Sequence, residues 1–155
     1  KNWERTINVN LNSVFVLIKE LLPMLEKKRG NVVNIASIHA TLTKINFSAY
    51  ATSKAALVGL TKSLAVELGS RIRVNAISPA AIDTPMLHKG FSDNLDGLND
   101  LKDFHPTGSI GVISDITRAV LFLINKDNTF LNGAILNIDG GISSCLHDPD
   151  LINND

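Results

Sequence analysis

The apolar residues along this chain change their spacing several times. Between residues 2 and 28 they recur every three or four positions, which predicts one long amphipathic helix ended by Arg29-Gly30. Pro23 is expected to kink this helix or to mark a break near its end. Residues 31–36 form a short apolar run rich in β-branched side chains, and we expect a buried strand there.

The remainder of the chain continues to alternate between helical and extended patterns. Ser48 is a suitable N-cap for a helix that runs to residue 68, with Gly69 just past its end. A second strand is expected over residues 72–77 and is ended by Ser78-Pro79. The other predictions are a loop over residues 37–47, a long loop after Pro79, a short amphipathic helix over residues 93–104, a helix capped by Ser114-Asp115 that runs to about residue 125, a strand over residues 134–138 and a polar tail from residue 143 to 155.

This order of elements predicts an α/β fold in which a parallel sheet is joined by helical crossovers. Three strands make a small sheet, and the strand over residues 31–36 has an open side unless a segment upstream pairs with it. The chain also begins with Lys1, inside a helical pattern, rather than with Met. We therefore expect that an amino-terminal portion is missing.

Composition narrows the class of protein. The 155 residues include fifteen Lys and Arg against fifteen Asp and Glu, and this balance argues against a partner that is nucleic acid or an anionic membrane. No apolar stretch approaches the ~20 residues of a membrane span, and no signal peptide opens the chain. The single cysteine, Cys145, excludes a disulfide framework and fits a reducing, cytoplasmic location. The four histidines lack the spacing of metal ligands, so no metal is expected.

The candidate chemistry begins with Tyr50 and Lys54, which lie four residues apart and so share one helix face. A phenol is a poor base at neutral pH, but a neighbouring ammonium and the positive end of a helix both favour the phenolate. A surface tyrosine beside a solvated lysine is the alternative interpretation of this pair. Two further residues favour catalysis: Ser37 ends a predicted strand at the edge where open α/β sheets place their sites, and Asn10 lies in a helix with three closely spaced asparagines.

Taken together, these segments resemble the carboxyl-terminal part of a short-chain dehydrogenase/reductase. The resemblance extends over nearly the whole chain to about Ile142, and it includes a Tyr-x-x-x-Lys segment at Tyr50 and Lys54. The other segments that carry it are Trp3 to Phe15, Asn31 to Ser37, Arg73 to Pro79 and Thr107 to Gly141. It implies a doubly wound, Rossmann-like parallel sheet that is incomplete here, with residues 1–142 as the catalytic part of one domain and residues 143–155 as a tail.

The resemblance also implies a role for each residue that matches the family pattern. Tyr50 would be the general acid/base, Lys54 would assist it and hold the nicotinamide ribose, and Ser37 would bind the reacting oxygen. Asn10 would position a water that links Lys54 to solvent. The residues expected to contact an NAD or NADP cofactor are Tyr50, Lys54, Pro79, Ile82 and Thr84. The implied substrate is a small alcohol or carbonyl compound, and the implied assembly is a homo-oligomer, a dimer or tetramer when full length.

Two departures from the family pattern affect this interpretation. Ala80 stands where the family has a glycine after Pro79, which restricts the turn beside the nicotinamide. The Gly-rich turn after a first strand, which binds the dinucleotide, is absent from these 155 residues. Two alternatives therefore stay open. The chain is a non-catalytic protein with the same fold, or it is a truncated product that does not bind the cofactor on its own.

Overall fold

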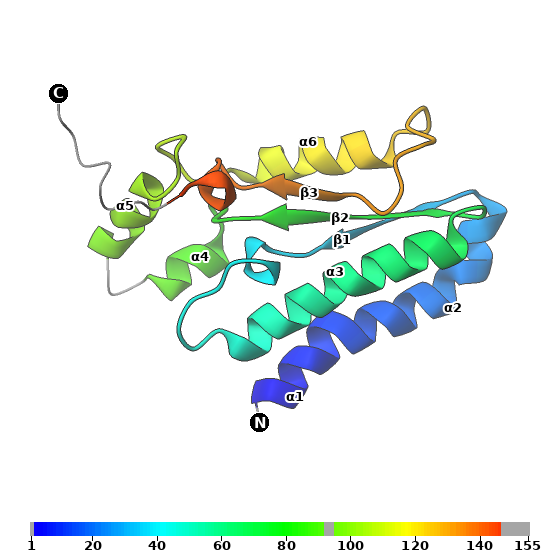
Figure 1. The fold of residues 1–155 in the computed structure, drawn as a ribbon, viewed down its shortest axis with the longest axis horizontal. Helices are drawn as coiled ribbons and strands as arrows, with labels where there is room; N and C mark the ends of the chain where they lie inside the picture. The colour runs from blue at the N-terminus through cyan, green and yellow to red at the C-terminus, as the bar shows by residue number, and fades with distance from the viewer. Residues whose placement is uncertain (1, 92–94, 147–155) are drawn as a thin grey trace.

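The computed structural model describes residues 2–91 and 95–146, and it has a parallel three-stranded sheet between helical layers (Figure 1). In chain order the elements are α1 (Asn2–Ile7), the π-helical turn η1 (Asn8–Asn12), α2 (Ser13–Lys27), β1 (Asn31–Ile35), the 3-10 turn η2 (Ile38–Ala40), α3 (Ser48–Leu68), β2 (Arg73–Pro79), α4 (Pro85–Gly90), α5 (Leu95–Asp103), α6 (Ile113–Ile124), β3 (Ile135–Ile138) and the 3-10 turn η3 (Ile142–Ser144). The strand order is β1-β2-β3, with α1, α2 and α3 on one face of the sheet and α6 on the other. The predicted α/β class and parallel sheet are confirmed.

Each face of the sheet has its own hydrophobic core, and β2 contributes to both. Val74 is fully buried among side chains of α2 and α3, whereas Ile77 is fully buried among side chains of α6. Successive side chains of a strand point to opposite faces, so residues three apart serve opposite layers. This two-sided burial explains why successive residues of β2 are buried without alternation.

Buried polar side chains fix the position of α3 on the sheet. The amide of Asn34 in β1 donates a hydrogen bond to Thr61 Oγ1 in α3 at 2.9 Å, and Thr61 Oγ1 donates to the Leu57 carbonyl at 2.8 Å. Asn34 and Thr61 are both buried, and a buried polar group left without a partner is costly. The pair therefore sets the register of α3 along β1, and with it the position of the residues at the start of α3.

The carboxyl ends of the three strands lie at one edge of the sheet. Ile35 pairs with Ile77, and farther along β2 the partner of Pro79 is Ile138. In open parallel sheets this edge is where ligands bind.

The first helix differs from its prediction. The single helix expected over residues 2–28 is instead two α-helices joined by the π-helical turn Asn8–Asn12. In a π-helical turn the backbone hydrogen bonds span one residue more than in an α-helix. The spacing of apolar residues in the sequence does not reveal such a turn. Helix α2 runs through Pro23 to Lys27, so of the kink or break expected at that proline the break is wrong.

Two predicted boundaries are also wrong. Phe47, not Ser48, is the N-cap of α3, and it makes no side-chain cap hydrogen bond. The dipeptide Ser78-Pro79 belongs to β2 instead of ending it, because the Ala80 N–H still donates to the Ile138 carbonyl at 3.1 Å and the ladder continues past the proline.

The loop expected after Pro79 contains the short helix α4. Its N-cap is Thr84, whose Oγ1 accepts a hydrogen bond from the Leu87 N–H at 3.2 Å. Helix α6 begins at Ile113, with Val112 rather than Ser114 at the N-cap position, and Asp115 in its first turn accepts a hydrogen bond through Oδ2 from the Val112 N–H at 2.8 Å. The predicted helix over residues 93–104 is α5, but residues 93 and 94 lie outside the described part. The predicted tail begins inside η3, and its residues 147–155 also lie outside that part.

Candidate active site

Three elements bring the four predicted catalytic residues to the carboxyl end of β1. Ser37 follows β1 by two residues, and Tyr50 and Lys54 lie in the first two turns of α3. Asn10 lies in η1, which packs against α3. The first turns of α3 lie beside the connection from β1, as the ribbon shows (Figure 1).

The side chain of Asn10 is bound to α3. Its amide donates a hydrogen bond to Ser53 Oγ at 3.0 Å, and Ser53 Oγ donates to the Tyr50 carbonyl at 2.7 Å. Ser53 is fully buried between the two helices. The other asparagines of η1 have a local role, since the Asn12 amide donates to Asn8 Oδ1 at 2.7 Å. Only Asn10 of these three therefore reaches the residues beside Tyr50 and Lys54.

Lys54 joins α3 to the end of β1. Its Nζ donates a hydrogen bond to the Ile35 carbonyl at 2.7 Å and lies 5.7 Å from the centroid of the Tyr50 ring. Burial lowers the pKa of Lys54 below its ordinary value, because desolvation disfavours the charged form. An ammonium has three N–H donors, so two remain available for a ligand after the bond to Ile35.

Ser37 is buried at the start of η2. Its Oγ accepts a hydrogen bond from the His39 N–H at 3.2 Å. This contact uses an oxygen lone pair and leaves the hydroxyl hydrogen free to be donated elsewhere. The N-cap position therefore presents the hydroxyl as a donor at the edge of the sheet.

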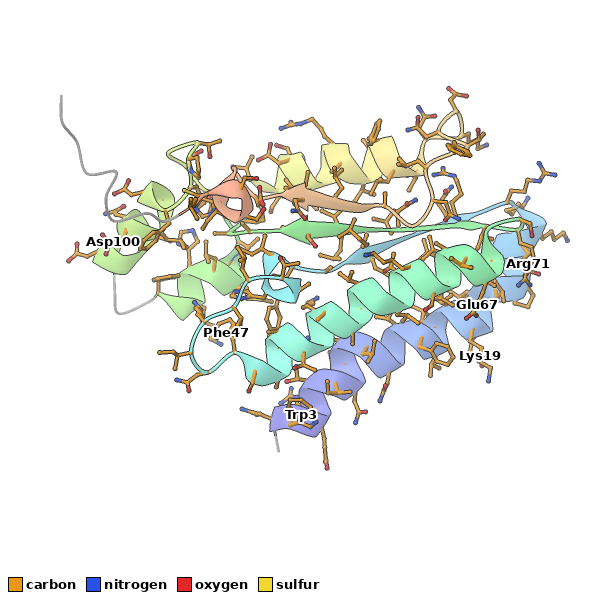
Figure 2. The ribbon with its side chains drawn as sticks, in the orientation of Figure 1. Trp3, Lys19, Phe47, Glu67, Arg71 and Asp100 are labelled. Carbon is orange, nitrogen blue, oxygen red and sulfur yellow. The ribbon has the colours of Figure 1, made fainter. Side chains whose placement is uncertain are left out.

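Sequence reasoning missed an aromatic cluster around Tyr50. The ring of His39 lies 4.8 Å from that of Phe47 and 5.7 Å from that of Tyr50, and Phe47 and Tyr50 are 5.9 Å apart, all between centroids. Lys44 Nζ lies 4.4 Å from the Phe47 centroid. Figure 2 shows Phe47 beside the amino-terminal end of α3. These contacts depend on how residues 38–47 fold back over α3, and no local spacing signals that path.

The predicted cofactor contacts Pro79, Ile82 and Thr84 follow one another along the exit from β2. Ile82 forms a parallel bridge with Gly111, whose two hydrogen bonds use the Ala81 carbonyl and the Asp83 N–H. In a parallel bridge the central residue directs its own N–H and C=O to the opposite side. The backbone groups of Ile82 therefore face away from Gly111, while the Thr84 hydroxyl caps α4.

A cavity of about 390 Å³ lies apart from this constellation. It is formed by the turn after β3 and the start of α6, and Arg118 and Asp139 contribute to its wall. None of the four predicted catalytic residues lines it. Its volume alone does not make it the catalytic site, because Tyr50 and Lys54, the candidate proton-transfer pair, lie outside it.

Within residues 2–91 and 95–146, no three His, Cys, Asp or Glu side chains gather where they could hold a metal ion. No helix in that part of the chain is long and apolar enough to cross a bilayer.

The family model described as Enoyl-(Acyl carrier protein) reductase matches residues 1–143. The chain belongs to the short-chain dehydrogenase/reductase family. It is similar to "Dehydrogenase/reductase SDR family member 6" of Danio rerio, with 38% identity over 90% of this chain and 60% of the relative. It is also similar to the 3-oxoacyl-(acyl-carrier-protein) reductase FabG of Chlamydia muridarum, with 37% identity over 92% of this chain and 57% of that one. The chain thus spans about three fifths of the length of these relatives.

Solved structures of this family have the same fold. The ligand-free aldohexose dehydrogenase of Thermoplasma acidophilum superimposes with a TM-score of 0.90 at 35% identity, over 95% of this chain and 61% of the other. ElxO with NADP bound gives a TM-score of 0.80 at 33% identity, over 88% and 56%. The 4-hydroxyisoleucine dehydrogenase complexed with NADH gives 0.82 at 34% identity, over 90% and 58%. Each of these two proteins therefore binds a nicotinamide dinucleotide.

Proposed function

We propose that this chain carries the catalytic part of an NAD- or NADP-dependent oxidoreductase that interconverts an alcohol and a carbonyl compound. The observation that carries the proposal is the position of Lys54, 5.7 Å from the Tyr50 ring centroid and bonded to the end of β1. Ser37 and Asn10 reach the same region from two other elements. Residues 1–142 would form this part of one Rossmann-like domain, with residues 143–155 as a tail.

Groups of this chain fit a nicotinamide cofactor. The backbone N–H and C=O of Ile82 face away from their bridge with Gly111 and suit the nicotinamide amide. The two N–H donors of Lys54 that do not bind Ile35 suit the ribose hydroxyls. Pro79 and Thr84 flank Ile82 and would border the nicotinamide and the pyrophosphate. When bound, the nicotinamide supplies or accepts the hydride.

Tyr50 and Ser37 would act on the substrate oxygen. In the reducing direction, the carbonyl carbon gains a hydride while Tyr50 gives its phenolic proton to the carbonyl oxygen, so the C=O double bond becomes an alcohol. In the oxidising direction, the Tyr50 oxygen takes the hydroxyl proton. Ser37 donates its free hydroxyl hydrogen to the same oxygen and stabilises the negative charge that develops on it.

Lys54 and Asn10 would restore the proton on Tyr50. Lys54 stabilises the tyrosinate electrostatically and holds the ribose, and Asn10 positions a water that connects Lys54 to solvent. The π-helical turn supports this role, because such a turn widens the helix at Asn10 and is frequent at functional sites. The bond from Asn10 to Ser53 would keep η1 at a fixed distance from Lys54.

The assembly that we propose is a homo-oligomer, formed through the outer side of α2 and α3. Large apolar side chains are exposed on these two helices, namely Phe15, Val16, Leu17 and Met24 of α2 and Val66 of α3. Surfaces of this kind are typical of protein interfaces. Sedimentation of the protein as its source makes it tests this assembly, and a monomer across the working concentration range would contradict it.

A screen for nicotinamide turnover tests the proposed activity. The protein as its source makes it is incubated with NADH or NADPH and a panel of aldehydes, ketones and oxo acids, and with NAD or NADP and the matching alcohols. Turnover of at least one compound that falls by 10²-fold or more in Ser37→Ala is expected. Cofactor binding without turnover on any compound would favour a non-catalytic member of the same fold instead.

A further inference from the structure

The aromatic cluster beside Tyr50 contains two cationic or titratable side chains that the proposed mechanism does not use. His39 contacts both Phe47 and Tyr50, and Lys44 Nζ lies over the Phe47 ring. Side-chain contacts therefore connect exposed Lys44, through Phe47, to Tyr50, the residue that we propose transfers the proton. The His39 Nδ1 atom is buried and has no hydrogen-bond partner among the described residues.

The sequence segment that forms this cluster carries charges of one sign. No acidic residue occurs in the sequence between Glu26 and Glu67, a segment that includes β1, η2 and nearly all of α3. The first acidic residue after β2 in the sequence is Asp83, and its carboxylate lies 2.6 Å from the His88 ring nitrogen. A segment whose charged side chains are all cationic attracts anions. The attraction is strongest where a cation lies beside an apolar surface, as Lys44 does beside the Phe47 ring.

We propose that Lys44 and His39 form a subsite for an anionic group of the substrate, so that the preferred substrates are oxo acids and hydroxy acids. This inference rests on the proposed function. Lys44 supplies the charge that attracts the anion. The His39 ring, which contacts both Phe47 and Tyr50, would supply a polar group beside that charge. A neutral ketone of the same shape would gain only the contacts at Tyr50 and Ser37.

The electrostatics of His39 support this subsite, and the pKa of His39 provides a way to measure its occupancy. Burial is the largest cause that lowers the pKa of His39, and the Lys44 ammonium is the second. A hydrogen bond with the Leu42 backbone raises this pKa. The other titratable or charged groups on the elements packed against η2 are Tyr50 and Lys54 in the first turns of α3, Lys62 and Glu67 in its second half, and Arg73 at the far end of β2. An anion beside Lys44 would offset the lysine charge, and the pKa of His39 would then rise.

The first test measures that pKa by NMR in the protein as its source makes it, with nicotinamide cofactor present. The probes are 2-, 3- and 4-oxopentanoate and their methyl esters, which match in shape and differ in charge. His39→Gln assigns the resonance. We expect the His39 pKa to rise with at least one acid and with no ester, and to stay constant in Lys44→Met. An equal response to acid and ester, or no response to either, would overturn the subsite. This readout does not require turnover.

The second test uses kinetics on the same pairs. Lys44→Met is expected to raise KM for the preferred acid about five- to tenfold and to leave its kcat and the KM of the ester nearly unchanged, as suits a surface charge pair. Lys44→Arg should keep the selectivity, and Lys126→Met, a change at an exposed lysine in the turn after α6, is the matched control. Turnover with equal preference for acid and ester would refute the subsite alone, whereas cofactor binding without any turnover would refute the proposed function.

Discussion

The amide of Asn10 donates a hydrogen bond to the buried hydroxyl of Ser53 at 3.0 Å, across 43 residues of sequence. Ser53 in turn donates to the carbonyl of Tyr50, and its neighbour in sequence is Lys54. The π-helical turn of the first helical segment is thereby joined to the two residues on which the proposed chemistry depends. Ser53 has no proton-transfer role in this account, and its function is to position its neighbours.

Replacing Ser53 with Ala should therefore affect stability and activity together. The change removes the acceptor of the Asn10 amide, and leaving such a group unsatisfied costs about 1–3 kcal/mol. Unfolding in denaturant measures the loss. Ser63→Ala is the matched control, since Ser63 lies on the same helix and is exposed. Equal stabilities of the two variants would contradict the positioning role of Ser53.

Replacing Lys54 with Met should separate its two effects. Burial lowers the folded-state pKa below the 10.5 of an unfolded lysine, so the unfolded chain binds more protons between these two values and stability rises with pH there. The Met variant should lack this rise and should also lack activity. Unfolding free energies measured from pH 8 to 10.5 test the first effect, and the same rise in wild type and variant would count against it.

His39 should make the protein more sensitive to acid. Its folded-state pKa lies below the ordinary 6.5, so its contribution is fully present above pH 6.5 and is lost as the pH falls from 6.5 toward the folded value. In His39→Leu the fall in stability below pH 6.5 should be smaller than in the wild type. Lys44→Met should reduce the same fall in part, because Lys44 is the second cause of the shift. Thermal unfolding of the three proteins from pH 4 to 8 makes the comparison.

The sheet and the residues at its carboxyl edge could be predicted from the sequence because their signals are local. The apolar run at β1 and the Tyr-x-x-x-Lys spacing on α3 each depend on a few adjacent residues. The edge on which Ser37 lies then follows from the parallel topology. Their catalytic roles stay predictions, because the fold places these residues without testing what they do.

Other features depend on contacts between distant segments, and the sequence did not reveal them. The π-helical turn at Asn10 leaves the apolar spacing unchanged, and its asparagine finds its partner only when α3 packs beside it. The contact of His39 and Phe47 with Tyr50 arises from the path of a segment that was predicted only as a loop. Pro79 remains in β2 because β3 supplies a partner to the next residue, which local rules for proline do not anticipate.

The most direct test of the central claim is the rate of hydride transfer in Tyr50→Phe, measured in a single turnover with the protein as its source makes it. Phenylalanine keeps the ring that packs on His39 and Phe47 and removes only the hydroxyl. We expect the variant to fold and to bind the nicotinamide cofactor with near-normal affinity, while hydride transfer slows by about 10²–10⁴-fold, the usual contribution of a general acid/base. A rate within a few-fold of the wild type would contradict the assignment of Tyr50 as the proton-transfer group.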